Sequence, residues 1–384
     1  TLLDIKNIQV TCLDEFDQLF KKEILKKPLI LIMDEFDALA EDANSGIAGV
    51  FRNIHHIRKK DTNPSEKKEY LLHGVALIGV RSVLGIENTK GSPFNVQRSL
   101  HIPELTYEET NSMFKCYEKE NSHVIEQDVI DRIYKETKGQ PGLVSWFGEL
   151  LTEGFEYFQP DFTRPLTIFD FEKVYAAAIQ VLPNNNILNI ISKAKQEPYK
   201  HIVMELFKTH EKIPFKFDDK NFNFLYMNGV IDVEANNDFL IKFPSPFVQK
   251  RLFNYFSHEL FHFMGILFEP FEDMDHIVTE THLNIKNLMR RYEKHLQKNR
   301  DWMLKDAPRR SDLKIYEAVF HFNLYEYLMR FFESYQTKVW PEFPTGNGKV
   351  DIFIEHGGNT YALEIKSYRD KPAYEQALTQ AAKY

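Results

Sequence analysis

Three charged side chains stand on two apolar-alternating runs that flank a Gly357-Gly358 pair near the end of the sequence. A two-residue type I′ turn needs positive φ at both of its positions, which glycine adopts without steric cost. The register set by such a turn puts Asp351 of the first run opposite Glu364 of the second. Because side chains alternate between the faces of a strand, Lys366 joins them on the same face. The hairpin therefore predicts two carboxylates and an ammonium in one place.

Two carboxylates directly opposite each other on paired strands repel unless a cation lies between them. Oxygen ligands suit a hard divalent metal such as Mg²⁺ or Mn²⁺, which keeps several bound waters. The ammonium of Lys366 could then position, or help to deprotonate, a metal-bound water that attacks a phosphodiester. The chemistry that we expect is phosphodiester hydrolysis. The simpler alternative is a salt bridge across a surface hairpin.

A further carboxylate precedes the hairpin on a predicted helix, in the run SDLKIYEAVFHFNLYEYLMRFF. Glu317 shares a helical stripe with apolar side chains, and a carboxylate on a buried face is unfavourable without a partner. We therefore expect Glu317 to complete the metal shell. After the hairpin, Gln380 and Tyr384 lie one turn apart on a final predicted helix, for which a solvated face is the alternative.

This layout of helix, strand, strand and helix resembles the PD-(D/E)XK nuclease superfamily. The resemblance covers residues 310–384, and the residue before Asp351 is Val350 rather than the proline of the motif. The active-site residues that the resemblance implies are Glu317, Asp351, Glu364, Lys366 and Gln380. The three acids would bind the metal, the lysine would be the catalytic lysine, and the glutamine would be an auxiliary residue on the last helix.

A second pair of carboxylates, Asp34 and Glu35, follows the apolar run PLILIM. In an open α/β sheet, the ligand site lies at the carboxyl ends of the strands. The stretch resembles a Walker B element, which implies that Asp34 orders Mg²⁺ and that Glu35 activates water for attack on ATP. Arg81 or Ser82 would then occupy a sensor-like position near the γ-phosphate. The alternative is a pair of acids at the N-terminus of the next helix.

Sequence landmarks up to about residue 255 resemble bacterial AAA-like ATPases with a helical lid and a winged helix. In that resemblance Arg98 would serve a neighbouring subunit as an arginine finger, which implies a homo-oligomer. The sequence has no G-x-x-x-x-G-K-[ST] P-loop, and only about 30 residues precede the Walker B-like strand. We expect the chain as given to bind ATP poorly, and ATP to be a cofactor only where a P-loop precedes it.

His258, Glu259 and His262 match H-E-x-x-H, the helical zinc motif of metalloproteases, in which both imidazoles share one face. The surrounding phenylalanines favour packing roles for these histidines instead. Nothing in the sequence singles out a third ligand among the candidates, which are His276, Glu280 and His282. Zinc-dependent proteolysis is therefore the lesser alternative.

The elements that position these residues follow from periodicity. Apolar runs separated by helical patterns predict a parallel sheet buried on both faces in the first third of the chain. Helices follow, beginning at a capping box formed by Thr106 and Glu109. Further helices and a strand pair around an Asn-Asn-Asp turn predict a winged helix. The segment 286–314 has ten Lys or Arg against four acids, which predicts a phosphate-contacting patch or a solvated helix.

The predicted fold class is multidomain α/β, with a partial P-loop-type parallel sheet, a helical lid, a winged helix and a C-terminal restriction-endonuclease-like domain. The predicted boundaries are 1–105 for the AAA-like core, 106–183 for the lid, 184–256 for the winged helix, 257–309 for a basic helical connector and 310–384 for the nuclease domain.

The composition restricts the partners. The 384 residues carry a net charge of −8, so any nucleic-acid site must be a local patch on an acidic protein. Cys12 and Cys116 are far apart, which excludes a disulfide framework and favours a cytoplasmic setting. The sequence shows no leader and no apolar run long enough to span a membrane.

We therefore expect a metal-dependent nuclease that acts on nucleic acid, with DNA as the expected substrate, under the control of an AAA-like ATPase module. Bacterial defence or mobile-element biology is an expectation by analogy alone. The alternative of another class is a non-catalytic, oligomerising ATPase-like scaffold.

Overall fold

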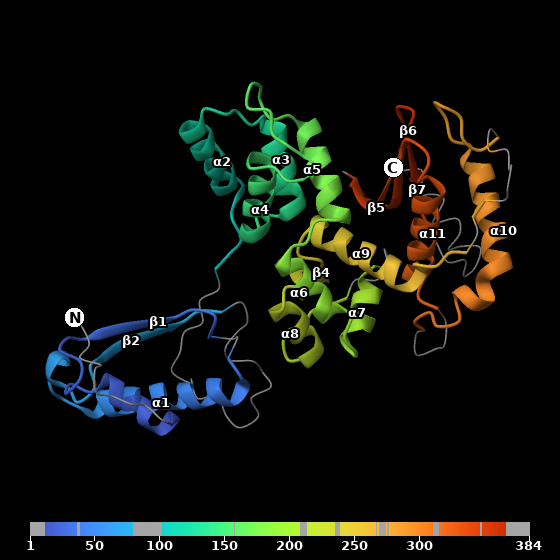
Figure 1. Cartoon of the computed structure of the whole chain (residues 1–384). Coiled ribbons are helices and arrows are strands. Elements are labelled where there is room, and N and C mark those ends of the chain that lie inside the picture. Colours follow the sequence, from blue (N-terminus) through green and yellow to red (C-terminus); the bar gives the residue numbers. More distant parts are fainter. Residues whose placement is uncertain are drawn as a thin grey trace. The chain divides into compact units, whose positions relative to one another are not determined.

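The computed structural model describes residues 12–36, 39–79, 102–156, 158–207, 213–234, 239–265, 267–268, 274, 276–309, 315–345 and 348–365 (Figure 1). They form a mixed α/β structure of helices and small sheets. The chain divides into two compact units, residues 1–102 with 216–228 and residues 103–215 with 229–384. Among the helices of the described ranges, none has the length and apolar character needed to cross a bilayer.

The first unit contains a β-α-β segment. β1 (Leu29–Met33) pairs in parallel with β2 (Leu72–Leu77), and α1 (Glu41–Lys60) connects them. Two 3₁₀ helices, η2 (Leu13–Phe20) and η4 (Ser65–Lys67), and the helix α8 (Lys220–Met227) also belong to this unit. The parallel pairing predicted from the two apolar runs is confirmed.

One face of this two-stranded sheet packs on a hydrophobic core and the other face is open. Leu31 and Met33 pack against the core to which α1 and η2 contribute. Ile30 and Ile32, which alternate with them, are 66% and 64% exposed. The prediction of a sheet buried on both faces is therefore wrong for the described strands. Side chains alternate at period two, so the layer of α1 and η2 buries only one face.

The second unit begins with a helical bundle of α2 (Tyr107–Asn121), α3 (Gln127–Thr137), α4 (Pro141–Thr152) and α5 (Ile168–Gln180). The capping box predicted at Thr106 and Glu109 is confirmed. The Glu109 amide donates to Thr106 Oγ1 at 3.1 Å, and the Thr106 amide donates to Glu109 Oε2 at 2.8 Å. These two bonds satisfy backbone donors that have no partner inside the helix.

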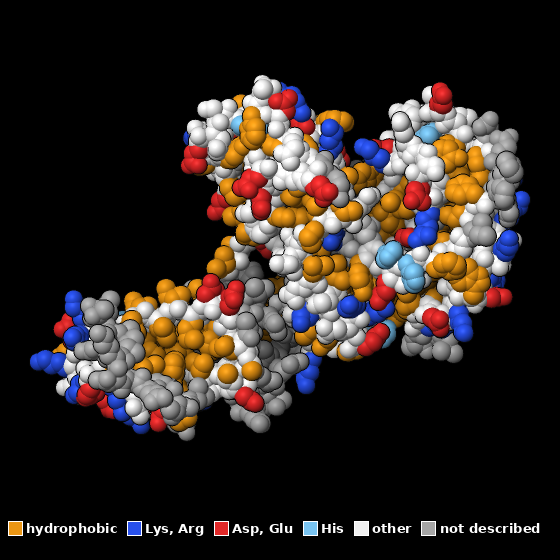
Figure 2. Space-filling view, in the orientation of Figure 1, with side chains coloured by type: hydrophobic (Ala, Val, Ile, Leu, Met, Phe, Trp, Pro, Cys, Tyr) orange, Lys and Arg blue, Asp and Glu red, His pale blue; other side chains and the backbone are white. Residues whose placement is uncertain are grey.

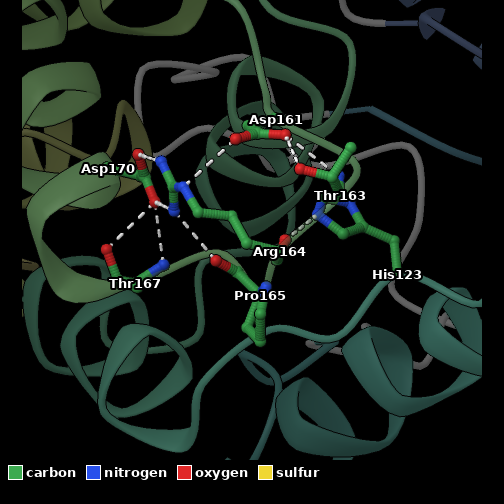
Figure 3. Close-up of polar contacts among 7 residues, drawn as sticks. All are labelled: His123, Asp161, Thr163, Arg164, Pro165, Thr167 and Asp170. Carbon is green, nitrogen blue, oxygen red and sulfur yellow. Dashed lines mark hydrogen bonds and ion pairs between the residues drawn. The ribbon is translucent and has the colours of Figure 1, made fainter.

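The loop before α5 is fixed by an arginine and an aspartate (Figure 3). The Arg164 guanidinium donates from Nη1 to Asp170 Oδ2 at 2.7 Å and from Nη2 to Oδ1 at 2.8 Å. Asp170 also accepts from the amide and the hydroxyl of Thr167, which closes a capping box at the start of α5. The hydrogen bonds from Arg164, followed by those from Thr167, lower the pKa of the buried Asp170 to about 2.

Two helices, a hairpin and a long helix follow the bundle. They are α6 (Asn185–Ala194), α7 (Tyr199–Leu206), the antiparallel strands β3 (Asp232–Glu234) and β4 (Leu240–Lys242), and α9 (Pro246–Phe261). The strand pair predicted around the Asn-Asn-Asp turn is confirmed. The assignment of these elements to a winged helix stays a prediction.

α9 is held to the bundle by a buried charged network. Lys250 Nζ lies 3.1 Å from Glu136 Oε2 of α3 and 2.9 Å from the Tyr175 hydroxyl of α5. That hydroxyl donates to the same Glu136 oxygen at 2.7 Å. Burial lowers the pKa of Lys250, and Glu136 opposes this shift. The next residue of α9, Arg251, donates to the carbonyls of Ala178 and Ile179 in the last turn of α5 and to that of Leu182 just after the helix.

The last part of the unit has α10 (Ile285–Met303), α11 (Glu317–Phe331) and an antiparallel sheet in the order β5-β6-β7. Its strands are β5 (Thr337–Thr345), β6 (Gly348–His356) and β7 (Asn359–Leu363). Phe322 of α11 packs edge to face on Phe253 of α9, with 4.7 Å between ring centroids. Tyr292 of α10 donates to Asn323 Oδ1 of α11 at 2.8 Å. These contacts position α11, which precedes the sheet that carries the candidate site.

Candidate functional site

The β6–β7 hairpin has the turn and the register that the sequence predicts. Gly357 and Gly358 both adopt positive φ, at 55° and 79°. The paired residues run from His356 with Asn359 at the tip to Ile352 with Leu363 at the end of β7. The predicted register is therefore confirmed, and the geometry of the two glycines explains it.

The tip of the hairpin lies against the segment that precedes α10. A Cβ atom added to Gly357 would lie 2.4 Å from Thr281 Cα, whereas one added to Gly358 would meet nothing within 4 Å. Asn359 donates from Nδ2 to the Thr281 carbonyl at 2.7 Å. Gly357 is thus required for close backbone approach as well as for its φ.

Asp351 is fully buried on β6, where an unpartnered carboxylate would be costly. Its Oδ2 accepts a hydrogen bond from the backbone N–H of Ile365 at 2.6 Å. Glu364 is half-buried and directly follows Leu363, the last paired residue of β7. The ladder ends at the pair of Ile352 with Leu363, so Asp351 and Glu364 are the next residue of each strand. Their pairing across the hairpin stays a prediction.

A buried histidine lies beside this pair, and the sequence interpretation missed it. His321 of α11 is fully buried, and its Nδ1 lies 3.8 Å from Asp351 Oδ1. The sequence contained a signal, because His321 follows Glu317 by one helical turn and so shares its face of the helix. A polar side chain repeated at that spacing on an otherwise apolar stripe could have drawn attention to it.

The rest of the predicted nuclease set is only partly described. Glu317 is the first residue of α11, on the same helix face as His321, and its side chain is not among those described. Lys366, Gln380 and Tyr384 lie outside the described residues.

The Walker B-like acids occupy the predicted end of a strand. Asp34 and Glu35 directly follow Met33, the last residue of β1, and both are exposed. The Glu35 amide donates to Asp34 Oδ1 at 2.9 Å, and Glu35 has a positive φ of 52°. A non-glycine residue in this region of φ is uncommon and costs backbone energy. The other predicted residues of this module, Arg81, Ser82 and Arg98, lie outside the described residues.

The H-E-x-x-H segment ends α9 instead of lying within it. The helix stops at Phe261, so His262 is its C-cap, and the His258 and His262 rings are 6.1 Å apart. The Glu259 carboxylate accepts hydrogen bonds from Lys200 Nζ at 3.3 Å and from the Tyr255 hydroxyl at 3.4 Å. In the zinc motif this glutamate would be the general base. Its contacts with Lys200 and Tyr255 favour a structural role instead.

The donor chemistry beside Asp351 suits a divalent cation. Asp351 and Glu364 offer carboxylate oxygens, and oxygen ligands are those that Mg²⁺ and Mn²⁺ prefer. Among the side chains that the structure describes, no three His, Cys, Asp or Glu are arranged to hold a metal ion. Asp351 and Glu364 would therefore need a further ligand such as Glu317. The candidates for a third zinc ligand, His276, Glu280 and His282, form no such group with the α9 histidines among the described side chains.

Comparison with protein-family models gave no match for this chain, and comparison with curated proteins gave none either.

Proposed function

We propose that this chain is a metal-dependent nuclease that hydrolyses phosphodiester bonds of nucleic acid, with DNA as the expected substrate. The observation that supports the proposal is the β6–β7 register, whose last pair of Ile352 with Leu363 leaves the buried Asp351 and Glu364 as the next residues of their strands. Like charges so placed are unfavourable alone, and a divalent metal removes the repulsion.

Each residue of the site would have its own role in binding the metal or the substrate. Asp351 is oriented by the Ile365 N–H, so its other oxygen, Oδ1, stays directed toward α11, where His321 lies. Glu364 and Glu317 would complete the ligands of Mg²⁺ or Mn²⁺. Such an ion, when bound, polarises a phosphoryl oxygen and lowers the pKa of bound water. Lys366 would place its ammonium beside the scissile phosphate, and Gln380 would support the site from the last helix.

The first unit would regulate this activity. The β1–β2 pair has the parallel arrangement of an open α/β sheet and presents Asp34 and Glu35 at its carboxyl end. We assign it to an AAA-like module that would use ATP and Mg²⁺ only together with a P-loop, and that would assemble as a homo-oligomer in the cytoplasm. Bacterial defence is the role that this combination fits by analogy.

The test uses the full chain with supercoiled plasmid and with end-labelled DNA and RNA oligonucleotides, in Mg²⁺, in Mn²⁺ and in EDTA. We expect metal-dependent cleavage that Asp351→Asn and Glu364→Gln reduce by about 100-fold or more. The matched control is Glu355→Gln, which removes a carboxylate from the same strand at a position paired with Thr360. Equal cleavage by the wild type and both site variants would refute the assignment.

A second candidate, a non-catalytic oligomerising scaffold, is favoured by the open apolar face of β1–β2. It predicts a concentration-dependent oligomer, no cleavage with either metal, and nucleic-acid binding that Asp351→Asn leaves unchanged. A zinc-dependent peptidase activity that His258→Ala abolishes would favour neither candidate and would support the metalloprotease alternative.

A further inference from the structure

α10 carries a row of exposed side chains at four-residue intervals. The row consists of Lys286, Arg290, Lys294, Lys298 and Trp302, all of which are exposed. Residues four apart are neighbours on one side of a helix. Other positions of the same helix face inward: Leu288 and His295 are buried, and Tyr292 bonds to α11. Each step of four residues turns about 40° past a full turn, so the exposed row winds about 160° around the helix from Lys286 to Trp302.

The four cations are regularly spaced along the helix axis. Each step of four residues advances by about 6 Å, so the row presents one positive charge per helical turn. Separate Lys and Arg side chains are visible at the right edge of Figure 2, where α10 lies in Figure 1. A flexible backbone with one negative charge per repeat unit matches such a row, and a nucleic-acid strand has this property.

The row ends at two exposed aromatic rings. Trp302 is 43% exposed and Phe263, in the segment after α9, is 66% exposed. Their ring centroids are 5.6 Å apart with an interplanar angle of 50°. Both rings line a pocket of about 290 Å³, together with Glu259, His262 and Asp306. Large aromatic side chains usually bury their surface, so a pair that opens into a pocket marks a binding site for a flat, apolar group.

The pocket and the row prefer different parts of one ligand. The Asp306 carboxylate of the pocket repels phosphate but can accept hydrogen bonds from the amino groups of a base. The cations of the row favour phosphates. A duplex keeps its bases stacked on one another, whereas a single strand offers base faces to aromatic side chains. An acidic peptide would satisfy the row but leave the rings without a partner.

We propose that α10 and Phe263 bind one single strand of nucleic acid, with successive phosphates on Lys286, Arg290, Lys294 and Lys298 and a base in the pocket against Trp302. This inference rests on the proposed nuclease function in that it names the form of the substrate. It assigns single-strand capture to a surface distinct from the metal ligands.

The test is fluorescence anisotropy with the full chain, in EDTA, so that binding is measured without cleavage. The probes are a labelled DNA strand of about 20 nucleotides, the RNA strand of the same sequence and the DNA duplex of the same length. We expect tighter binding of the single strands than of the duplex. Because each phosphate contact adds about 0.7 to the salt slope for a single strand, the four cations should supply a slope of up to about 3.

Two variants separate the parts of the surface. Replacing all four cations of the row by Gln should weaken single-strand binding by at least about tenfold and remove most of the salt slope. Trp302→Ala should weaken single-strand binding by about 5- to 150-fold, leave the salt slope unchanged and leave duplex binding unchanged. The control is Arg300→Gln on the same helix, off the row, where Arg300 lies 3.6 Å from Asp301. It should change binding by less than about twofold.

Equal binding by the wild type and by both variants overturns the inference, as does a preference for the duplex or for a poly-glutamate of matching charge. Equal affinity for DNA and RNA strands supports it, because stacking and phosphate contacts do not read the sugar. Cleavage assays separate the two proposals. If the protein cuts nothing but replacing the row abolishes single-strand binding, the nuclease proposal alone is refuted. If the protein shows metal-dependent cleavage but replacing the row does not change single-strand binding, this inference alone is refuted.

Discussion

His321 Nδ1 of α11 lies 3.8 Å from Asp351 Oδ1 of β6, and both side chains are fully buried. Groups next to metal ligands orient them, and replacing such groups commonly lowers metal affinity by about 10- to 100-fold. We expect His321→Leu to weaken Mn²⁺ binding by that factor, measured by electron paramagnetic resonance without nucleic acid. His295→Leu removes another buried histidine, on α10, and should lower stability without changing Mn²⁺ affinity. Equal Mn²⁺ affinity in the wild type and His321→Leu would contradict a positioning role.

The two glycines of the hairpin tip should respond differently to the same substitution. Gly357→Ala meets the Thr281 backbone as well as an unfavourable φ, whereas Gly358→Ala meets only the φ penalty. We expect losses of about 2–3 kcal/mol and about 1 kcal/mol, respectively. Urea unfolding followed by tryptophan fluorescence measures this, because Trp146, Trp302 and Trp340 all lie in the second unit. Equal losses at both positions would show that Thr281 does not constrain the tip.

The Lys250–Glu136 pair should behave as a buried ion pair. Lys250→Met leaves the buried Glu136 carboxylate with Arg132, whose Nε lies 3.4 Å from Oε1, as its remaining cation, and should cost about 3 kcal/mol, the lower end for a broken buried pair. Adding Glu136→Gln removes the buried charge, and we expect the double variant to recover most of that loss. A double-mutant cycle from urea unfolding measures the coupling. Additive losses in the double variant would mean that the two groups do not interact in the folded protein.

Asp170 gives a dependence of stability on pH. Its folded pKa, about 2, is below the ordinary value of 3.8. The folded state therefore holds fewer protons than the unfolded state between these values, and the stabilisation present above pH 4 is lost as pH falls toward 2. We expect Asp170→Asn to cost about 1 kcal/mol at neutral pH, because the half-exposed Arg164 is partly screened by water, and to cost little near pH 2. A wild-type-minus-variant difference that does not change with pH would contradict this.

The open face of β1–β2 should tolerate charge. Ile30→Lys replaces an exposed side chain and should change stability by less than about 0.5 kcal/mol, while reducing self-association. Leu31→Lys, one residue along, places an ammonium against the core and should unfold the β-α-β segment. Size-exclusion chromatography and hydrogen exchange of the β1 amides distinguish the two. Unfolding by Ile30→Lys would mean that another layer covers this face.

Local chemistry explains what the sequence could predict. Two adjacent glycines select one turn, and that turn fixes every pair from His356–Asn359 to Ile352–Leu363. Thr106 and Glu109 form a capping box because the motif needs only neighbours in the chain. The apolar runs of β1 and β2 indicated parallel strands, but an apolar run does not record how many layers cover it. Ile30 and Ile32 are consequently exposed although their sequence is typical of a strand buried on both faces.

Contacts between distant segments were the part that the sequence could not supply. His321 meets Asp351 only because α11 packs beside β6, and no local pattern encodes that distance. The basic segment was recognised by its composition alone. Its arrangement as a row ending at Trp302 required knowing that residues 285–303 form one helix with Phe263 at its end.

The buried network of Lys250 and Arg251 has a consequence for how this protein can change over generations. Both residues fall in the predicted winged-helix segment, 184–256, while Glu136, Tyr175 and the end of α5 fall in the predicted lid, 106–183. A foreign counterpart of the segment 106–183 would leave the Lys250 ammonium buried without the Glu136 carboxylate, and a foreign counterpart of 184–256 would leave Glu136 with Arg132 as its remaining cation. The two segments are therefore expected to be inherited as one piece, even where the proteins that contain them are otherwise assembled by shuffling.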